Sequence, residues 1–570
     1  GIVPRPAWEW IGESMKQVGF SPPELWEEAS ALGWYQGCPA DPGINVICRH
    51  REYVLALGLE LGYDLQKELE YQSFDAVLAD NSVYWRSYWD KVPRVSLPDE
   101  FMNKFYRLAL YKFACATDPA GGIPASLQGP WLEEYQRSPW SCDYHFNVNI
   151  QQIYTLGFGT GAWENILPLF DMLESESFQS VMRSNAKNLF GIDDGLLLTH
   201  AVDDRGFQCC GISVGAVLDF ACGGWVGKLY WDYYRHTLDK EFLRKRAFPF
   251  ITGVMRIYEA ALEERKDESL SLPLSISAEY GHAFPVKKDG KLCRQNSGRN
   301  PSNQLMCAHM LSEILIEAST ILELEPKQEW LNVRERLPLY CEGGESGNER
   351  IILWEGQDLD VCHRHHSHLA GIYPFENLSE PTKEQARVID NTIDHWILLG
   401  MGQWSEWCYP WAAIIQARLG FTEAPAQLLN LWKELFVNES MSTVYLPRFR
   451  GLSAHRRADM LKPKESHEIM QLDGTMAGAT AIQEMLVHRK MDTIYVFPGI
   501  PEKWQDVSFE NIRLPGGICV SAVRNHGRTV NVQIKSVGDG SIKIKLPENI
   551  SPITVDLEAG KEKNIDGTAD

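Results

Sequence analysis

A group of polar side chains lies in the segment Asp-Tyr-His-Phe-Asn-Val-Asn, residues 143–149. In an extended segment alternate side chains point to one face, so His145, Asn147 and Asn149 are expected to project together. Three hydrogen-bonding groups on one face are costly to bury against an apolar core. The pattern therefore fits either a site for a polar ligand or a buried hydrogen-bond network.

A second group is the run from His363 to His368, which holds four histidines and one arginine in six residues. Its spacing does not match the H-E-x-x-H pattern of zinc enzymes, and no Cys or Glu stands nearby in a known zinc pattern. We therefore expect neither a metal nor a cofactor. The predicted roles are to bind hydroxyl groups and to brace a catalytic carboxylate. A loop held by histidine-to-backbone hydrogen bonds is the structural alternative.

Two acidic residues stand where general acid–base chemistry is possible. Glu279 follows an apolar stretch and precedes Gly281, so it could lie at a pocket wall, where partial burial keeps a carboxyl group protonated. An exposed loop acid is the alternative. Asp473 precedes Gly474, just before a helix expected to begin near Met476. For Asp473 the simpler interpretation is a turn or N-cap acid.

Several segments, in order from about residue 84 to 515, are similar to stretches of one enzyme family. Residues 122–131 are similar to "LPANLQGIW", residues 143–151 to "DYHLNINLQ", and residues 363–374 to "HRHLSHLYGLYP". Ser277-Ala278-Glu279 stands where that family has Ser-Pro-Glu. Gln403-Trp404-Ser405 resembles "GWSLAW", and Asp473-Gly474 resembles "IDGNFG". Taken together, the chain resembles the α-L-fucosidases of glycoside hydrolase family 95.

The resemblance implies an inverting exo-hydrolase. Glu279 would be the general acid, Asn147 and Asn149 would position the attacking water through their side-chain carbonyls, and Asp473 would be the basic partner. Inversion requires room for that water, so about 6.5–9.5 Å should separate the acid from the base. The residues expected to bind the sugar or to brace Asp473 are His145, Trp131, Asp203, His363, Arg364, His365, His368 and Trp404.

The chain also departs from the family pattern, so the sequence does not determine which sugar would be released. Ala278 replaces the family's Pro, and residues 475–478 replace its "NFGG". L-Fucose and L-galactose differ only at C6, where a hydroxyl replaces a hydrogen, so a few pocket residues could switch the preference. Hydrolysis of an α-L-galactoside or of another α-linked sugar is therefore an alternative to hydrolysis of an α-L-fucoside.

Two further classes of function stay open on the residues alone. A polysaccharide lyase could use Tyr144, His145 and Asn147, although a uronate substrate would favour a basic cleft. A non-catalytic carbohydrate-binding protein would need neither Glu279 nor Asp473. A glycan is the expected partner in every case.

The composition of the chain limits which other classes of partner it can bind and where in the cell it is expected to act. The 570 residues carry a formal net charge of −21, which disfavours nucleic acid and leaves neutral sugars unaffected. No run of about 18 apolar residues exists, so no membrane-spanning helix is expected. The 13 cysteines are scattered without a C-x-x-C pair, which disfavours a disulfide framework. Free thiols slightly favour a cytoplasmic location. A secreted or periplasmic one stays open, because the chain begins at Gly1.

Helices are expected to position these groups. Asp99 can cap a helix in which Phe101, Phe105, Leu108 and Ala109 recur at helical spacing. Long loops between the helices carry Trp, His, Asn, Asp and Glu residues, which favours helical hairpins that close into a ring with the chemistry on loops at one end. Similar amphipathic blocks follow at 163–191, 223–262, 303–324, 383–399, 409–420, 424–436 and 475–488.

Strand patterns flank the helical region. Residues 44–48 and 53–57 are predicted strands, and so are residues 493–497, 517–520, 530–534 and 542–546. With the resemblance, this pattern predicts a mainly α, multidomain protein in four parts. These are an N-terminal β-domain remnant (1–75), a linker (76–98), an (α/α)6 barrel catalytic domain (99–489) and a C-terminal β-sandwich (490–570).

Overall fold

The computed structural model describes residues 44–49, 52–57, 73–131, 139–209, 217–280, 286–288, 291–293, 297–449, 451–455 and 469–567. The chain forms two compact units. One unit comprises Gly1–Lys91 with Glu133–Arg137, and the other comprises Val92–Leu132 with Ser138–Asp570. All the predicted site residues belong to the second unit.

The first unit contains a β-hairpin and one helix. Strands β1 (Ile44–Arg49) and β2 (Glu52–Leu57) pair antiparallel, with Ile44 opposite Leu57. Both predicted strands in this region are therefore confirmed. Helix α4 (Phe74–Lys91) follows and occupies most of the stretch that we expected to be a linker. The division into a β-domain remnant and a linker stays a prediction.

Helices dominate the second unit up to residue 486, as the amphipathic blocks predict. The helices of this region are α5 (Glu100–Ala116), α6 (Asn149–Thr160), α7 (Leu167–Glu174), α8 (Glu176–Phe190), α10 (Ala221–Thr237), α11 (Lys240–Phe242), α12 (Phe248–Ala261), α13 (Ser302–Ile321), α14 (Gln328–Arg336), α15 (Lys383–Leu399), α16 (Cys408–Arg418), α17 (Ala424–Phe436) and α19 (Leu472–Leu486). Shorter helical turns are η1 (Pro139–Cys142), η2 (Trp163–Ile166), η3 (Leu243–Ala247) and η4 (Ser367–Leu369).

Helix α5 shows why the sequence folds in this way. The side chain of Asp99 accepts a hydrogen bond from the Met102 backbone N–H, so the predicted N-cap is confirmed. Along α5, Phe105, Ala109 and Phe113 recur at helical spacing and are buried. Burial of such an apolar face supplies most of the stability of a helix in a folded protein.

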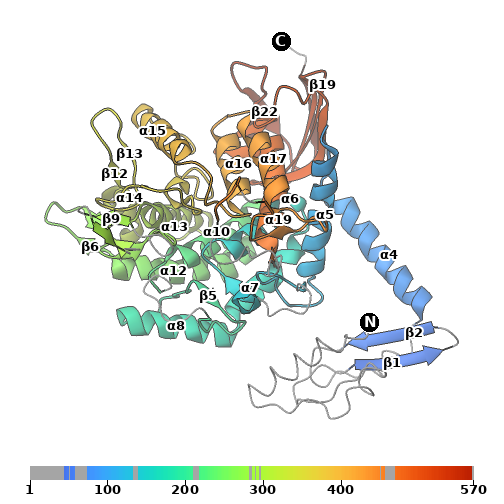
Figure 1. Ribbon diagram of the computed structural model, residues 1–570, viewed down its shortest axis with the longest axis horizontal. Helices are drawn as coiled ribbons and strands as arrows, with labels where there is room; N and C mark the ends of the chain where they lie inside the picture. The colour runs from blue at the N-terminus through green and yellow to red at the C-terminus, as the bar shows by residue number, and fades with distance from the viewer. Residues whose placement is uncertain are drawn as a thin grey trace. The chain divides into compact units, whose positions relative to one another are not determined.

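The helices that carry the site pack closely against one another. Helix α19 contacts α5, α6 and α16, and Figure 1 shows α16, α17 and α19 side by side. A Cβ atom added at Gly478 of α19 would lie 2.3 Å from the Trp432 ring of α17. Only a glycine therefore permits this approach, which sets the position of α19 and of the acid in its first turn.

Short antiparallel pairs join the loops between the helices. Three of them matter for the site, because they bring distant segments together: β4 (Tyr144–His145) with β5 (Ala201–Val202), β8 (Ser275–Ile276) with β11 (Ser297–Gly298), and β14 (Thr443–Val444) with β15 (Met470–Gln471). The other pairs are β6 (Glu263–Glu264) with β7 (Leu270–Ser271), β9 (Val286–Lys288) with β10 (Lys291–Cys293), and β12 (Glu342–Gly343) with β13 (Arg350–Ile351).

Strands replace helices after residue 486, as predicted. One sheet has the order β16 (Val487–Lys490), β17 (Thr493–Val496), β21 (Gly540–Lys545) and β22 (Ile553–Leu557). The other has the order β23 (Glu562–Asp566), β20 (Arg528–Ser536), β19 (Ile518–Asn525), β18 (Val507–Leu514) and β3 (Arg94–Ser96). These strands are red in Figure 1, apart from β3. That β3 joins this sheet from a position before α5 was not predicted.

The architecture is thus a helix-rich region followed by a strand region. Along the part of the chain that the structure describes, no helix has the length and apolar character needed to cross a lipid bilayer.

Candidate active site

The segment after β4 carries the first three site residues. Strand β4 pairs with β5, and the Phe146 backbone N–H donates to the His200 carbonyl at 2.7 Å, which places His200 beside His145. The prediction of one extended segment from 143 to 149 was wrong. Only Tyr144 and His145 form a strand, and Asn149 is already the first residue of α6. Asn149 reaches the site from the helix terminus rather than from a strand face.

Two asparagine amides connect this segment to the two predicted catalytic carboxyl groups. Asn147 Nδ2 donates to Glu279 Oε1 at 2.9 Å, and Asn149 Nδ2 donates to Asp473 Oδ2. Asn147 Oδ1 is buried and has no hydrogen-bond partner among the described residues. Buried polar atoms are normally paired, so this amide carbonyl has an unused capacity to accept a hydrogen bond.

Glu279 lies on a loop that other loops hold in place. Its backbone adopts a positive φ of 47°, which is uncommon for a residue other than glycine and often occurs at functional sites. On one side, the Ser277 hydroxyl is 2.7 Å from that of Ser367. On the other, the Tyr280 hydroxyl accepts the Asp360 backbone N–H at 3.0 Å. The side chain of Glu279 is 17% exposed, so it can meet a ligand.

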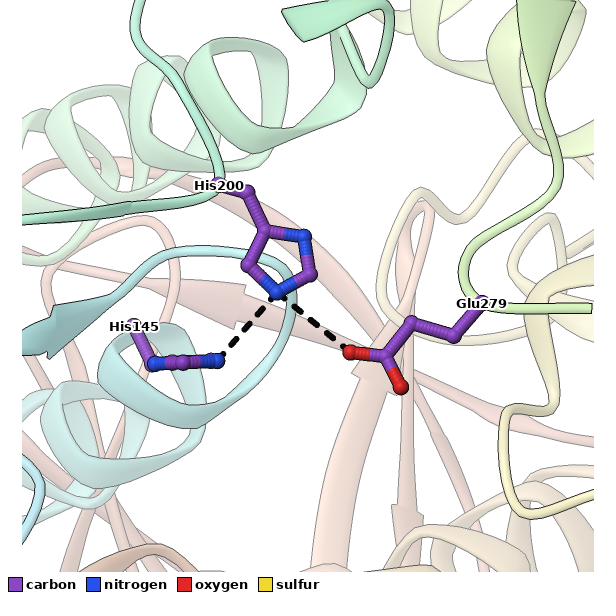
Figure 2. Close-up of side chains that lie close together, drawn as sticks. All are labelled: His145, His200 and Glu279. Atoms are coloured by element: carbon purple, nitrogen blue, oxygen red, sulfur yellow. Dashed lines mark hydrogen bonds and ion pairs between the residues drawn. The ribbon is translucent and has the colours of Figure 1, made fainter. Parts of the chain in front are cut away.

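Basic side chains surround the Glu279 carboxyl group. His200 Nε2 lies 3.3 Å from Oε1, His365 Nε2 lies 3.7 Å from Oε2, and Arg364 forms an ion pair with Oε2. Figure 2 shows His145 and Glu279 on either side of His200, with the His145 and His200 Nε2 atoms 3.2 Å apart. The Arg364 contact opposes our expectation that burial keeps Glu279 protonated, because a neighbouring cation favours the carboxylate form.

Burial keeps the histidines of the site neutral at neutral pH. Desolvation lowers the pKa of His145 and of His200, although a bond from His145 Nδ1 to the Asp143 carboxylate at 2.7 Å partly opposes this effect. Burial also lowers the pKa of His365 well below its usual range. Neutral rings can donate and accept hydrogen bonds at once, which suits contacts to hydroxyl groups.

The segment from residue 363 to 368 is held mainly by backbone contacts. His363 Nε2 bonds to the Ala278 carbonyl at 3.1 Å, and His366 Nε2 bonds to the Cys408 carbonyl at 3.1 Å. The Cys408 thiol in turn donates to the Arg364 carbonyl at 2.9 Å. These contacts of His363 and His366 are those of the structural alternative, a loop held by histidine-to-backbone hydrogen bonds, and they fix Arg364 and His365 beside Glu279.

Asp473 lies in the first turn of α19, not at its N-cap. Its Oδ1 accepts the Gly474 backbone N–H at 2.6 Å, and its side chain is fully buried. Desolvation raises its pKa from 3.8 to about 6, and the Asn149 hydrogen bond opposes this rise. A buried carboxyl group with a pKa near neutrality is able to take up a proton during a reaction.

Glu406 is a residue of the site region that the sequence prediction missed. It is fully buried, and its pKa lies well above the usual range because of burial and the nearby charge of Asp473. One signal was available: an acid between Trp404 and Trp407, in an aromatic stretch that should be buried, is unusual without a partner.

The structure brings together one set of possible metal ligands. Within the described ranges, the ligand atoms of His145, His200 and Glu279 lie within 4.8 Å of one another, whereas the 363–368 segment forms no such set. The positive charge of Arg364 on the same Glu279 carboxylate opposes a cation at this position.

Four residues predicted to bind the sugar do not join this group. In the part of the chain that the structure describes, Trp131, Asp203, His368 and Trp404 make no hydrogen bond or ion pair to Glu279, Asp473 or the two asparagines. Asp203 instead accepts from the Arg205 and Phe207 backbone N–H groups at 2.9 Å each. His368 is 2% exposed and Trp404 is 3% exposed. Their role in binding stays a prediction.

A solved structure shares this fold, in which a helical region is followed by strands. That structure is a protein from the human microbiome assigned as a kojibiose phosphorylase. It superposes with a TM-score of 0.61 at 10% sequence identity, over 94% of this chain and 78% of its own. At this identity the likeness concerns the fold alone.

Sequence comparison identifies the family. Residues 87–486 match the glycosyl hydrolase family 95 catalytic domain, and the chain belongs to that family. It is 26% identical to alpha-L-fucosidase 2 of Arabidopsis thaliana, over 71% of this chain and 46% of the relative. It is 23% identical to the probable alpha-fucosidase A of Aspergillus niger, over 75% of this chain and 53% of the relative. The chain thus spans about half the length of these relatives.

Proposed function

We propose that the protein is an inverting exo-glycoside hydrolase that releases a terminal α-L-fucose-like sugar from an oligosaccharide or glycan. Its helices would form an (α/α)6 barrel, with the site on loops at one end. Glu279 would protonate the leaving oxygen. Asn147 and Asn149 would position the attacking water, and Asp473 would be the basic partner.

The observation that carries this proposal is the pair of hydrogen bonds from Asn147 to Glu279 and from Asn149 to Asp473. Each bond uses an N–H of the amide and leaves its carbonyl oxygen as an acceptor for a water O–H. The unpaired Oδ1 of Asn147 fits this role. Inversion needs space for water between acid and base, and in our proposal the two amides define that space.

Asp473 is needed because amides are poor bases. As water attacks the sugar, it loses a proton, and a carboxylate must stabilise the developing positive charge. Asp473 accepts from Asn149, so it orients that amide and strengthens its carbonyl as an acceptor. The raised pKa of Asp473, about 6, makes it a better proton acceptor than an ordinary carboxylate.

The role of Glu279 requires a change at its ion pair. Arg364 favours the carboxylate, whereas a general acid must carry a proton when the bond breaks. In our proposal the substrate displaces Arg364 from Oε2, and Arg364 then binds sugar hydroxyls together with His145 and His365. Loss of that ion pair in a dry site favours the protonated form of Glu279.

The sugar is proposed from the two relatives, which are named as fucosidases. A panel of aryl α-L-fucoside, α-L-galactoside and other α-glycosides tests it. We expect the α-L-fucoside or the α-L-galactoside to give the highest kcat/KM. Comparable rates with unrelated pyranosides, or a product that absorbs in the ultraviolet as a lyase product does, would overturn the proposal.

The role of the acid is tested with Glu279→Gln. A positioned general acid contributes about 10²- to 10⁴-fold, and the loss should grow as the aryl leaving group becomes more basic. A loss below about tenfold would refute the assignment of Glu279. Glu268→Gln is the matched control, because the Glu268 side chain makes no hydrogen bond or ion pair to the site residues in the part of the chain that the structure describes.

A further inference from the structure

Glu406 is a buried acid that the proposed mechanism does not use. It lies two residues before α16, and its side chain is 0% exposed. Over the described ranges of the chain, no cation forms an ion pair with it, and neither Oε1 nor Oε2 accepts a hydrogen bond from an N–H group of another residue. The neighbouring Ser405 hydroxyl is 3.4 Å from the Cys408 thiol. An ionised carboxyl group in this position would be strongly unfavourable.

Glu406 and Asp473 share one buried space, although they are 67 positions apart in the sequence. A Cβ atom added at Gly474, the residue after Asp473, would lie 2.8 Å from Glu406 Cγ. The two carboxyl groups interact directly, and the negative charge of Asp473 is the largest influence on the Glu406 pKa after burial. The first turn of α19 and the loop before α16 thus place two acids in contact.

A single proton shared by the two acids removes the electrostatic repulsion between their carboxylates. Two carboxylates can only accept hydrogen bonds and repel each other, but a carboxylic acid can donate to a carboxylate. Asp473 accepts from the Asn149 amide and from the Gly474 backbone N–H, whereas the groups that act on Glu406 are its own backbone N–H and the Ser405 hydroxyl, and its pKa still lies above that of an ordinary carboxyl group. The donors therefore stabilise the negative charge on Asp473 and leave the proton on Glu406.

We propose that Glu406 is a positioning residue of the hydrolytic site, which donates its own proton in a hydrogen bond to Asp473 and holds Asp473 as the anion that orients Asn149. This inference rests on the proposed function. The charged and titratable groups that face the pair are Arg364, which acts on Glu406 through its charge, and the Cys408 thiol. The water-positioning amide is thus supported by two acids that together carry one negative charge.

The test compares Glu406→Gln with Glu406→Leu in the pH dependence of kcat/KM. The Gln amide can still donate to Asp473, so the acid limb should stay in place and kcat/KM should fall less than about threefold. Leu cannot donate. Without the donor the Asp473 anion is less stable, so the acid limb should move up by about one pH unit and kcat/KM should fall about 10- to 100-fold. Equal profiles in the two variants would overturn the proposal.

Gly474→Ala tests the contact without removing either acid. The new methyl group would push Glu406 away from Asp473, so this variant should resemble Glu406→Leu. Gly223→Ala is the control, because it adds a methyl group to helix α10 at an ordinary contact distance of 3.4 Å from Val254. An unchanged acid limb in Gly474→Ala with a folded protein would count against the proposal.

A readout without substrate separates this inference from the proposed function. The infrared difference spectrum of the native protein minus Glu406→Gln at about pH 7.5 should contain the C=O stretch of a buried protonated carboxyl group, because native Glu406 keeps its proton above its usual range. If the band is present and no glycoside is hydrolysed, the proposed function fails and the proton assignment holds. If the band is missing, Glu406 is ionised and the inference fails.

Discussion

Replacement of Asp473 by Asn should stabilise the protein at neutral pH while it removes activity. Asp473 is fully buried, and its pKa rises from 3.8 to about 6, mainly through desolvation. When the pKa of an acid is higher in the folded than in the unfolded state, folding favours the protonated form. The resulting gain in unfolding free energy is full at pH values below the unfolded pKa and is lost as the pH rises through the folded pKa. The rise corresponds to roughly 3 kcal/mol of unfolding free energy, lost between about pH 4 and pH 6.

Asn cannot ionise, so the unfolding free energy of Asp473→Asn does not fall in this way as the pH rises. Its Oδ1 can still accept from the Gly474 backbone N–H, whereas its Nδ2 replaces the oxygen that accepts from Asn149, and the cost of that lost hydrogen bond is the same at both pH values. The difference in unfolding free energy between variant and native protein should therefore grow by roughly 1–3 kcal/mol between pH 4.5 and pH 7.5. We expect kcat/KM to fall by about 10²- to 10⁴-fold, since Asp473 is the proposed basic partner.

Denaturant unfolding at the two pH values measures the stability difference, with aryl glycoside hydrolysis as the second assay. Asp219→Asn is a matched control. Asp219 is also buried, also has a pKa of about 6 and accepts from Gln304 Nε2 at 2.8 Å. It should show a similar pH-dependent gain in stability with a smaller loss of activity. A stability difference for Asp473→Asn that is the same at both pH values would refute the reasoning.

Three further predictions follow from the site. Arg364→Gln removes the cation that favours the Glu279 carboxylate, so the basic limb of the pH–rate profile should move to higher pH; an unmoved or lower limb would show that Arg364 does not act on the acid. Asn147→Ala should lower kcat by about 10²-fold with little change in KM, and a pure KM effect in steady-state kinetics would mean that Asn147 only binds substrate. Treatment with EDTA followed by dialysis should leave activity unchanged, and a loss that Zn²⁺ restores would point to a metal on His145, His200 and Glu279.

The sequence predicted those elements that carry strong local signals. Helices α15 and α17 begin and end at the predicted residues, and α15 has a capping box between Thr382 and Gln385. The C-terminal strands are short and are separated by connections of a few residues, such as residues 526–527 between β19 and β20. Capping, helical periodicity and turn chemistry act over a few residues, so they can be read without tertiary information.

Elements without such signals were missed. Helix α6 has no side-chain cap at Val148, and its residues are buried almost all round, so it lacks an amphipathic pattern. The alternation of polar residues before it therefore suggested a longer strand. Helix α14 also lacks a side-chain cap at Lys327. In both cases tertiary packing rather than local preference determines the helix.

The candidate catalytic residues were named on the sequence, but the contacts among them were not. Asn147, Asn149, Glu279 and Asp473 were named on the sequence, and the two amide bonds that join them require segments more than 130 positions apart. The neighbours that set the electrostatics, His200 and Glu406, were not named. Neither residue belongs to a local motif. Tertiary packing brings the loop that carries His200 to Glu279, and it brings the loop that carries Glu406 to Asp473.

The most direct test of the central claim is the stereochemistry of the first product. Proton NMR during hydrolysis of an α-L-glycoside should detect the β-anomer first, with the α-anomer following by mutarotation, because in the proposed mechanism water attacks the face opposite to the leaving oxygen that Glu279 protonates. The α-anomer as first product would mean retention through a covalent intermediate, and it would contradict the arrangement of acid, water and base described above.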